Sequence, residues 1–505
     1  MKNLFVLLLA ASSIVAACSG DDDDSSGNTG GTSNEAGKAS TAGKAGSGGS
    51  NAQAGMPAEG GSAPAGMAGA GAAGAGMAGA AGAGTTTFNV TIENVATPKS
   101  FVSGGVFNTP VGDANPGPAT PGKKYEFTVD AGRKQKLSFV TMLAASNDLF
   151  FGPDGDGIAL YDENGDPISG DVTDQVTLWD AGTEVNEEPH EGPNTVTKQA
   201  GPDTGPAENG NVVDIADTSD PFAYPNPDEV LSVMVTHLTG TQFKITITNV
   251  SAADALMTTG GDFPAPISPG VWVVHNGKDP LFTVGMPDRG KGLERIAEDG
   301  NPAVLGAFVA GNVGLTYPAS PGVWLVHSDD AMPLFTMDAA DYADGLEHIA
   351  EDGNPTMLGG ALASADGFVD GAVFNTPVGA GAPGPILPGS KYRFSFAAAP
   401  GDALSFVSML AATNDVFFGS GDQGIALFDA DGLPIDGDIT DQISLWDAGT
   451  EGNEQPGIGP NTVTNQLAPD TGTAGEGKVQ LLSQVNDGFT YPGVDEVLKV
   501  TITHD

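Results

Sequence analysis

Cysteine is almost absent from this 505-residue chain, in which Cys18 is the only one. A single cysteine excludes an intrachain disulfide and a cysteine-based zinc site, so any extra stabilisation must come from another source. Basic residues are also scarce: 19 Lys and Arg stand against 64 Asp and Glu, which gives a formal net charge of −45. Such an acidic protein repels phosphate backbones and attracts divalent cations, so we expect no nucleic acid among its partners.

Residues 1–18 have the pattern of a bacterial lipoprotein signal. An apolar run from Leu4 to Leu9 follows Lys2, and small residues lead to Val15-Ala16-Ala17-Cys18. This is typical of a cleaved export signal rather than a membrane span. The ending resembles a lipobox, which implies that Cys18 is diacylated and that the protein is held in the cell envelope, at the outer membrane or cell surface. An ordinary signal peptide cut near Ala17 is the alternative.

Residues 19–85 consist mostly of Gly, Ala and Ser, with four consecutive aspartates from Asp21 to Asp24. This composition cannot bury enough apolar surface to offset the entropy of ordering the chain. We therefore expect a disordered linker that tethers the folded part to the membrane through the lipid anchor only.

The remaining chain is predicted to be all-β. Residues 88–95 and 243–250 alternate apolar and polar side chains with the period of a half-buried strand. Residues 101–237 align without a gap to 368–504, and 80 of the 137 positions are identical. We interpret this duplication as two tandem β-sandwich domains, each opened by one copy of the alternating strand.

The predicted domain boundaries are 86–240 and 241–505. A second repeat, a strand followed by a short helix, occurs at 264–310 and again at 316–360. We call it the strand-helix module. Both copies fall after residue 240, so the sequence predicts that the second domain has the module twice and the first domain lacks it.

One acidic hexapeptide occurs in both repeats: Trp179-Asp180-Ala181-Gly182-Thr183-Glu184 returns as residues 446–451. A bulky indole beside two carboxylates indicates a buried anchor that holds an oxygen-rich turning loop. We expect buried core positions for all four tryptophans of the chain, which are Trp179, Trp272, Trp324 and Trp446. The Asn164-Gly165 pair predicts a tight hairpin turn, so the aspartates around it are interpreted as turn residues rather than an EF-hand.

An ordered set of motifs resembles the spondin domain, in the form found in bacterial surface proteins and in animal F-spondin. The motifs are Leu137–Leu143, Ser146–Asp148, Trp179–Glu184 and Pro193-Asn194. The strand-helix module resembles the first half of that domain, so the resemblance covers about residues 88–505. It implies an antiparallel, C2-like β-sandwich with short helices, an extracellular adhesive role and bound calcium.

The resemblance also implies which carboxylates bind calcium, by matching motif. They are Asp148, Asp180 and Glu184 in the first repeat and Asp415, Asp447 and Glu451 in the second. Glutamate stands at the last position of each set where the animal motif has aspartate.

Physical chemistry supports this assignment independently of the family. Three carboxylates on neighbouring loops repel one another unless a cation neutralises them, and oxygen-only ligands suit calcium better than zinc. Possible further oxygen donors are Glu187, Asn194, Glu454 and Asn461. A solvated acidic loop without an ion is the alternative.

No catalytic constellation assembles, so we expect no enzyme. His275 and His327 close their predicted strands and are interpreted as histidines with satisfied hydrogen bonds. The predicted function is a lipid-anchored, calcium-binding adhesion or matrix-interaction protein whose surface ligand, protein or glycan, is unknown. One alternative is an envelope enzyme that processes glycan or polymer through an acidic helix face, and another is a structural spacer. The acidic face comprises Glu294, Glu298, Glu347 and Glu351.

Overall fold

The computed structural model describes residues 84–328, 333–342, 344–364 and 367–505. The predicted signal segment 1–18, the lipidation site Cys18 and the linker up to residue 83 lie outside the described residues. Within the described ranges, no helix combines the length and the apolar character needed to cross a membrane. The described part consists mostly of antiparallel β-sheet, which confirms the all-β prediction.

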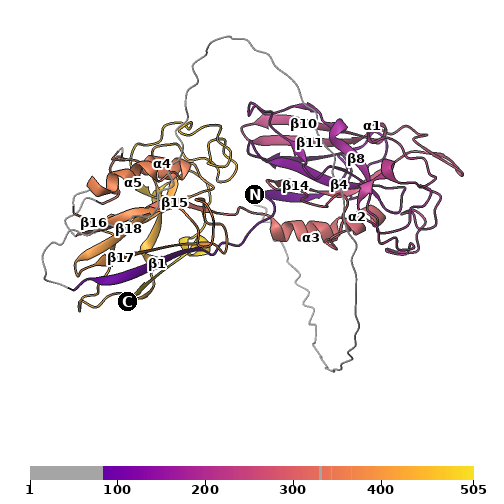
Figure 1. Cartoon of the computed structure of the whole chain (residues 1–505). Helices are drawn as coiled ribbons and strands as arrows, with labels where there is room; N and C mark the ends of the chain where they lie inside the picture. Colours follow the sequence, from indigo (N-terminus) through magenta and orange to yellow (C-terminus); the bar gives the residue numbers. More distant parts are fainter. Residues whose placement is uncertain (1–83, 329–332, 343, 365–366) are drawn as a thin grey trace, which may run out of the picture. The chain divides into compact units, whose positions relative to one another are not determined.

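The first sandwich, as we name it, combines two antiparallel sheets (Figure 1). The smaller sheet has the strand order β3 (Lys124–Asp130), β11 (Gln242–Asn249), β10 (Leu231–Thr239), β7 (Gly170–Asp171). The larger sheet has the order β2 (Ser103–Phe107), β14 (Ile267–His275), β4 (Lys136–Leu143), β5 (Leu149–Pro153), β8 (Val176–Asp180), β9 (Val213–Asp214), with β6 (Ile158–Ala159) also paired to β4. A small hairpin accompanies them, formed by β12 (Leu256–Thr258) and β13 (Gly261–Phe263).

The second sandwich repeats this architecture. Its smaller sheet has the order β17 (Lys391–Ala398), β1 (Thr86–Asn94), β24 (Leu498–His504), β21 (Gly437–Asp438). Its larger sheet has the order β16 (Phe368–Phe374), β15 (Ala319–Ser328), β18 (Asp402–Leu410), β19 (Val416–Ser420), β22 (Ile443–Asp447), β23 (Gln480–Leu481), with β20 (Ile425–Ala426) paired to β18.

Short helices complete both sandwiches. The first has α1 (Pro227–Val230), α2 (Leu293–Asp299), α3 (Ala303–Asn312) and the 3-10 turns η1 (Thr173–Gln175) and η2 (Ile215–Asp217). The second has α4 (Leu346–Asp352), α5 (Thr356–Ala361), α6 (Val494–Val497) and the 3-10 turns η3 (Leu362–Ser364), η4 (Thr440–Gln442) and η5 (Leu482–Gln484).

The central strand β4 shows how the first sandwich is built in three layers. Its residues Leu137 and Phe139 face the smaller sheet and pack into the core between the two sheets. Val140 and Met142 face the opposite way and pack with Ile296 of α2. Every residue of β4 after Lys136 is buried, and its two buried polar side chains, Ser138 and Thr141, have hydrogen-bond partners in β14. The larger sheet is therefore covered by the smaller sheet on one face and by the module helices on the other.

The predicted placement of the strand-helix module is wrong. The strand of its first copy, β14, pairs with β2 and β4 of the first sandwich, in register Val271 to Val140. The second copy, β15, pairs with β16 and β18. Each sandwich therefore has one module, and the expectation that the first repeat lacks it is corrected. Order along the chain suggested the assignment, but pairing between strands decides membership in a sheet.

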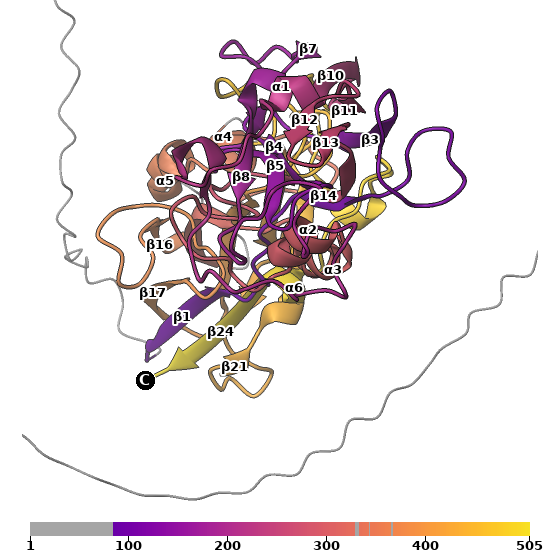
Figure 2. The same cartoon turned by 90° about the vertical axis from the view of Figure 1, so that its right-hand side faces the viewer.

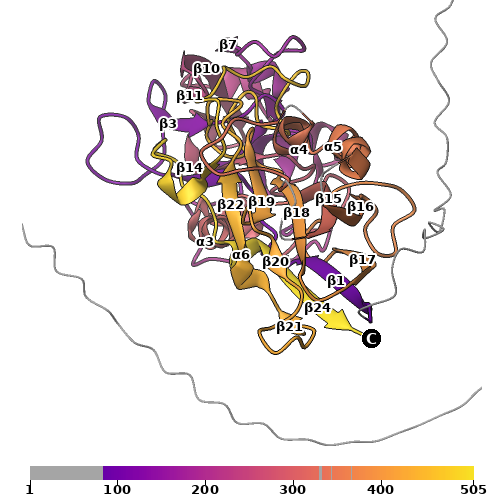
Figure 3. The same ribbon diagram turned by 90° about the vertical axis from the view of Figure 1, so that its left-hand side faces the viewer.

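The boundary predicted after residue 240 is corrected for the same reason, because it falls between β10 and β11. These strands form a hairpin, and β11 also pairs with β3. Strand β1 takes the equivalent place in the second sandwich, between β17 and β24. Figures 2 and 3 both show β1 beside β24, although they come from opposite ends of the described chain. Strand β1 was expected to open the first domain but belongs to the second sandwich. Strand β11 was expected to open the second domain but belongs to the first sandwich.

The expected reversal at Asn164-Gly165 is present, with a different local conformation. Gly165 has φ 80°, whereas Asn164 is not among the residues with positive φ. The turn is held instead by Asp162, whose Oδ1 accepts hydrogen bonds from the backbone N–H of Asn164 and Asp166. This aspartate therefore serves the turn, as predicted.

Candidate metal centre

The repeated hexapeptide is anchored by its tryptophan at the end of a buried strand. The ring of Trp179 is 6% exposed and its Nε1–H donates to the Gly152 carbonyl oxygen at 2.9 Å. Trp446 makes the same contact with Gly419 at 3.1 Å. The interpretation of these two tryptophans as core anchors is confirmed. Each anchored ring fixes where the acidic loop leaves its sheet.

Gly182 then turns the chain sharply. Its φ is 69°, and a Cβ atom at this position would lie 2.6 Å from the carbonyl oxygen of Asn211. Only glycine combines this left-handed conformation with such a close approach. Gly449 has the same conformation, with φ 67°. The turn brings the next two residues of the loop back to the strand end that carries Asp148.

Asp148 lies in the β4–β5 connection and is completely buried. Its Oδ2 accepts hydrogen bonds from the backbone N–H groups of Thr183 at 2.8 Å and Glu184 at 3.0 Å. Its Oδ1 lies 2.6 Å from the Thr183 hydroxyl, which donates to it. Asp415 accepts from the Thr450 hydroxyl and the Glu451 backbone in the same way. The carboxylate therefore joins two loops that are distant in sequence.

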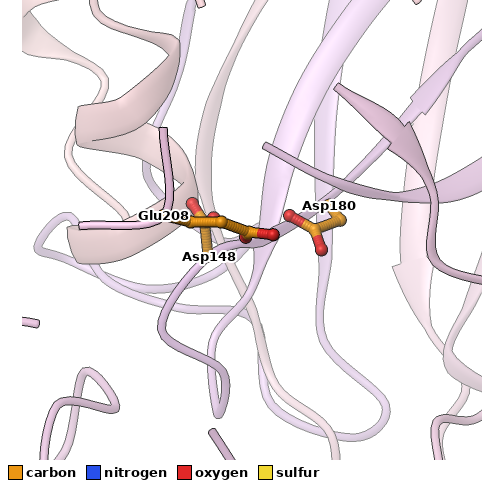
Figure 4. Close-up of side chains that lie close together, drawn as sticks. All are labelled: Asp148, Asp180 and Glu208. Atoms are coloured by element: carbon orange, nitrogen blue, oxygen red, sulfur yellow. The ribbon is translucent and has the colours of Figure 1, made fainter. Parts of the chain in front are cut away.

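Asp180 faces Asp148 from the end of β8. It is 2% exposed, and it accepts from the backbone N–H of Gly182 at 2.7 Å and from Asn186 Nδ2 at 2.5 Å. Carboxylate oxygens of Asp148, Asp180 and Glu208 lie within 4.8 Å of one another (Figure 4). We call these three residues the aspartate-pair group. Burial is the main cause that raises the pKa of both aspartates.

Glu184, the third predicted ligand, joins a different group. Its Oε1 accepts from the backbone N–H of Gly205 at 2.6 Å and its Oε2 from Asn147 Nδ2 at 3.3 Å. Its carboxylate lies within 4.8 Å of those of Asp203 and Glu298. The predicted ligand set is therefore distributed over two neighbouring acidic groups, and calcium binding by all six residues stays a prediction.

The sequence places Glu298 and its equivalent Glu351 only on an acidic helix face. They lie on α2 and α4 and are only 1% and 2% exposed, so this side of each helix is not solvated. Glu298 Oε1 lies 2.8 Å from the Thr183 hydroxyl, and Glu351 Oε1 lies 2.6 Å from that of Thr450. The signal that could have revealed this contact is the exact recurrence of the glutamate beside the apolar residues of both module helices.

The Thr183 hydroxyl has carboxyl oxygens on two sides but only one hydrogen to donate. If both acids are ionised, only one of them can accept this hydrogen, so protonation of either acid or a bound cation would relieve the contact. Burial, and next the carboxylates around it, raise the pKa of Glu298 to about 8. Burial also raises the pKa of Asp148 well above its usual range, so both acids favour the protonated form when no cation is present.

The two sandwiches differ at one acidic position. Gly475 occupies the place of Glu208, since the repeats align at an offset of 267. A pocket of about 580 Å³ lies there, lined by Asp447, Glu451 and Gly475 among other residues. In the second sandwich Asp447 therefore lines an open pocket, whereas Glu208 adds a third carboxylate in the first.

The other residues named from the sequence have internal partners. Glu187 accepts from the backbone N–H and the side-chain amide of Asn194, and Glu454 repeats this with Asn461. His275 is 1% exposed and its Nε2 lies 3.0 Å from the Ser138 hydroxyl. These contacts confirm that His275 is a core histidine with satisfied hydrogen bonds; His327 lies 2.9 Å from Ser405 in the same way.

No family model and no curated protein matches this chain. Membership in the spondin family therefore stays a prediction from the motifs.

Proposed function

We propose that this protein is a lipid-anchored adhesion or matrix-interaction protein of the cell surface, related to the spondin family, that binds calcium at the paired aspartates of each repeat. The ligands would be Asp148 and Asp180 with Glu208 in the first sandwich, and Asp415 and Asp447 in the second. Glu184 and Glu451 hold the hexapeptide loops in place by accepting hydrogen bonds from the backbone N–H groups of Gly205 and Gly472.

The observation that carries the proposal is the burial of two facing carboxyl groups with no cation beside them. Among the described residues, none of the ion pairs includes Asp148, Asp180, Asp415 or Asp447. Burying unpaired carboxylates is costly, so such groups hold either protons or a metal ion. Calcium is the hard cation that fits several carboxylates on loops.

An unsatisfied amide oxygen beside each pair supports the same proposal. Asn186 gives its Nδ2 to Asp180, and its Oδ1 is buried without a hydrogen-bond partner. Asn453 repeats both features beside Asp447. A buried acceptor without a partner costs about 1–3 kcal/mol. An amide oxygen is a common calcium ligand, so a bound ion would satisfy it.

The adhesive role rests on the acidic surface and on the lipid anchor predicted at Cys18. Calcium would neutralise the carboxylates and hold the hexapeptide loops in one conformation, so that each sandwich presents an ordered edge to a protein or glycan ligand. Glycan processing, the enzymatic alternative, finds no support in Glu298, because its carboxyl group is buried against Thr183.

Calorimetric titration of the full chain with calcium tests the proposal. We expect Asp180→Asn and Asp447→Asn each to abolish one binding event, because each removes a charged ligand from one sandwich. Binding of cells to a matrix-coated surface should depend on calcium and fall in the double variant. Unchanged calcium binding in the double variant would contradict the calcium part, and calcium-independent attachment would contradict the adhesive part.

A further inference from the structure

We propose that each sandwich has a second cation site, formed between the module helix and the loop that follows the hexapeptide. In the first sandwich its residues are Glu184, Asp203 and Glu298; in the second they are Glu347, Glu351 and Asp470. We call these the helix-loop sites. They are distinct from the aspartate pairs, since they use other carboxylates.

Geometry brings these residues together from three separate segments in the first sandwich and from two in the second, where Glu347 and Glu351 both lie on α4. In each sandwich, one oxygen from every carboxylate of the set lies within 4.8 Å of the other two. Glu298 comes from α2, Glu184 from the end of the hexapeptide, and Asp203 from the following loop. Asp203 and Asp470 align in the duplication and share a left-handed backbone, with φ 55° and 57°. The buried glutamate of the module helix and the aspartate of the loop therefore recur, whereas the third acid differs: it is Glu184 in the first sandwich and Glu347 in the second.

One atom of Glu298 points to a missing partner. Its side chain is 1% exposed and its Oε1 is used by Thr183, but its Oε2 is buried without a hydrogen bond. A buried polar atom is normally satisfied, and leaving it alone costs about 1–3 kcal/mol. A cation between the three carboxylates would satisfy this oxygen.

The charges around Glu298 have one sign. The carboxylates of Glu184, Glu294 and Asp203 each act to raise its pKa. The basic residue on the same helix, Arg295, lies 2.8 Å from Asp299 and is thereby engaged. Among the described residues no ion pair includes Glu184, Asp203 or Glu298. The acids of this group are therefore neutralised either by protons or by a cation from solution.

The donor set selects the class of cation. Oxygen-only ligands from carboxylates suit Ca²⁺, Mg²⁺ or Mn²⁺, and exclude a soft thiolate-type site. Asp203 and Asp470 are exposed, which gives the ion a path from solvent and leaves room for water ligands. Calcium, with its tolerance of irregular geometry, is the best match. A bound ion would tie α2 to the loop.

Calcium titration of the full chain by calorimetry, together with three pairs of variants, tests the inference. The helix-loop pair is Glu298→Gln with Glu351→Gln, in which the neutral amide replaces an acid of the same shape. The aspartate pair is Asp180→Asn with Asp447→Asn. The control pair is Asp174→Asn with Asp441→Asn, two exposed aspartates at equivalent positions outside both groups. We expect the helix-loop pair to lose two ions per chain, and the control pair to lose none.

The outcomes separate this inference from the proposed function. Loss of ions in the helix-loop pair alone supports the helix-loop sites and contradicts the aspartate pairs. Loss in the aspartate pair alone overturns the helix-loop sites and leaves the proposed function intact. Absence of calcium binding in the unaltered protein overturns both.

A second measurement guards against misfolding of the buried variants. Asp203→Asn with Asp470→Asn alters only exposed side chains, so the fold is retained, and the same two ions should be lost. In the unaltered protein, calcium should slow hydrogen exchange in α2 and in residues 200–207, and these substitutions should remove that effect. Calcium protection that persists in this variant would overturn the helix-loop sites.

Discussion

The hydroxyl of Thr183 lies 2.8 Å from the Oε1 atom of Glu298, although 115 residues separate them in the chain. Through this contact the hexapeptide loop of the β-sandwich meets the helix of the strand-helix module. Thr450 and Glu351 form the same contact in the second sandwich. The two motifs that each recur in the sequence are thus parts of one structural unit.

Replacing this threonine tests how strongly the contact stabilises the fold. Thr183→Val keeps the shape but removes the hydroxyl, so that Asp148 Oδ1 and Glu298 Oε1 both lose a buried partner. We expect the free energy of unfolding to fall by about 1–3 kcal/mol in urea denaturation. Thr183→Ser retains the hydroxyl and serves as the control. Equal stability of the valine and serine variants would show that the hydrogen bonds contribute nothing.

The turn at Gly182 should be intolerant of any side chain. Gly182→Ala places a Cβ atom 2.6 Å from the Asn211 carbonyl oxygen and also strains a left-handed backbone. We expect a loss of about 1–3 kcal/mol in thermal or urea unfolding. Gly122→Ala is the matched control, because Gly122 has φ 83° with no atom within 4 Å of the added Cβ. It should cost only the conformational part, about 1 kcal/mol. A similar loss in both variants would exclude the steric contribution.

Stability without calcium should fall as pH rises. The pKa of Glu298 and of Glu351 is raised from 4.5 to about 8, mainly by burial, so the folded state holds protons that the unfolded state releases. The folded state therefore binds more protons between about pH 4.5 and pH 8, and its stability decreases across that window. Melting temperatures measured in EDTA at pH 5, 6, 7 and 8 should decline accordingly.

Calcium should oppose this decline, since the ion replaces the protons. Its stabilising effect should be small at pH 5, where the acids are protonated, and largest near pH 8. In the Glu298→Gln, Glu351→Gln double variant the pH dependence should flatten. A calcium effect of the same size at both pH values would contradict the exchange of proton for metal.

Glu208 should make the aspartate pair of the first sandwich the tighter calcium site. Glu208→Gln removes one of three carboxylates and should weaken calcium binding there by about tenfold or more, since loss of even an outer partner of a metal site costs about 10–100-fold. Calorimetry should show no change at the second sandwich, where Gly475 replaces it. The exposed Glu163→Gln variant serves as the control. Equal affinities before and after the Glu208 substitution would exclude this residue from the site.

Much of this organisation could be predicted from the sequence. The alternation Phe88, Val90, Ile92 gave a half-buried strand, because strand side chains alternate between faces, and all three side chains are buried. The duplication predicted two copies of one fold. The hexapeptide predicted a buried tryptophan followed by an acidic turn. These features depend on local spacing, which a sequence displays directly.

Only the tertiary structure decided which strands share a sheet and which acids share a site. The period of a strand tells which face is buried but not which strand pairs with it, so β1 and β14 were assigned to the wrong repeats. The separation of Glu184 from Asp180 arises because the left-handed turn at Gly182 redirects the chain between them, which residue identity alone does not specify. Glu298 joins Glu184 only because α2 packs on the outer face of β4. Such proximity depends on packing between segments that are far apart in the chain.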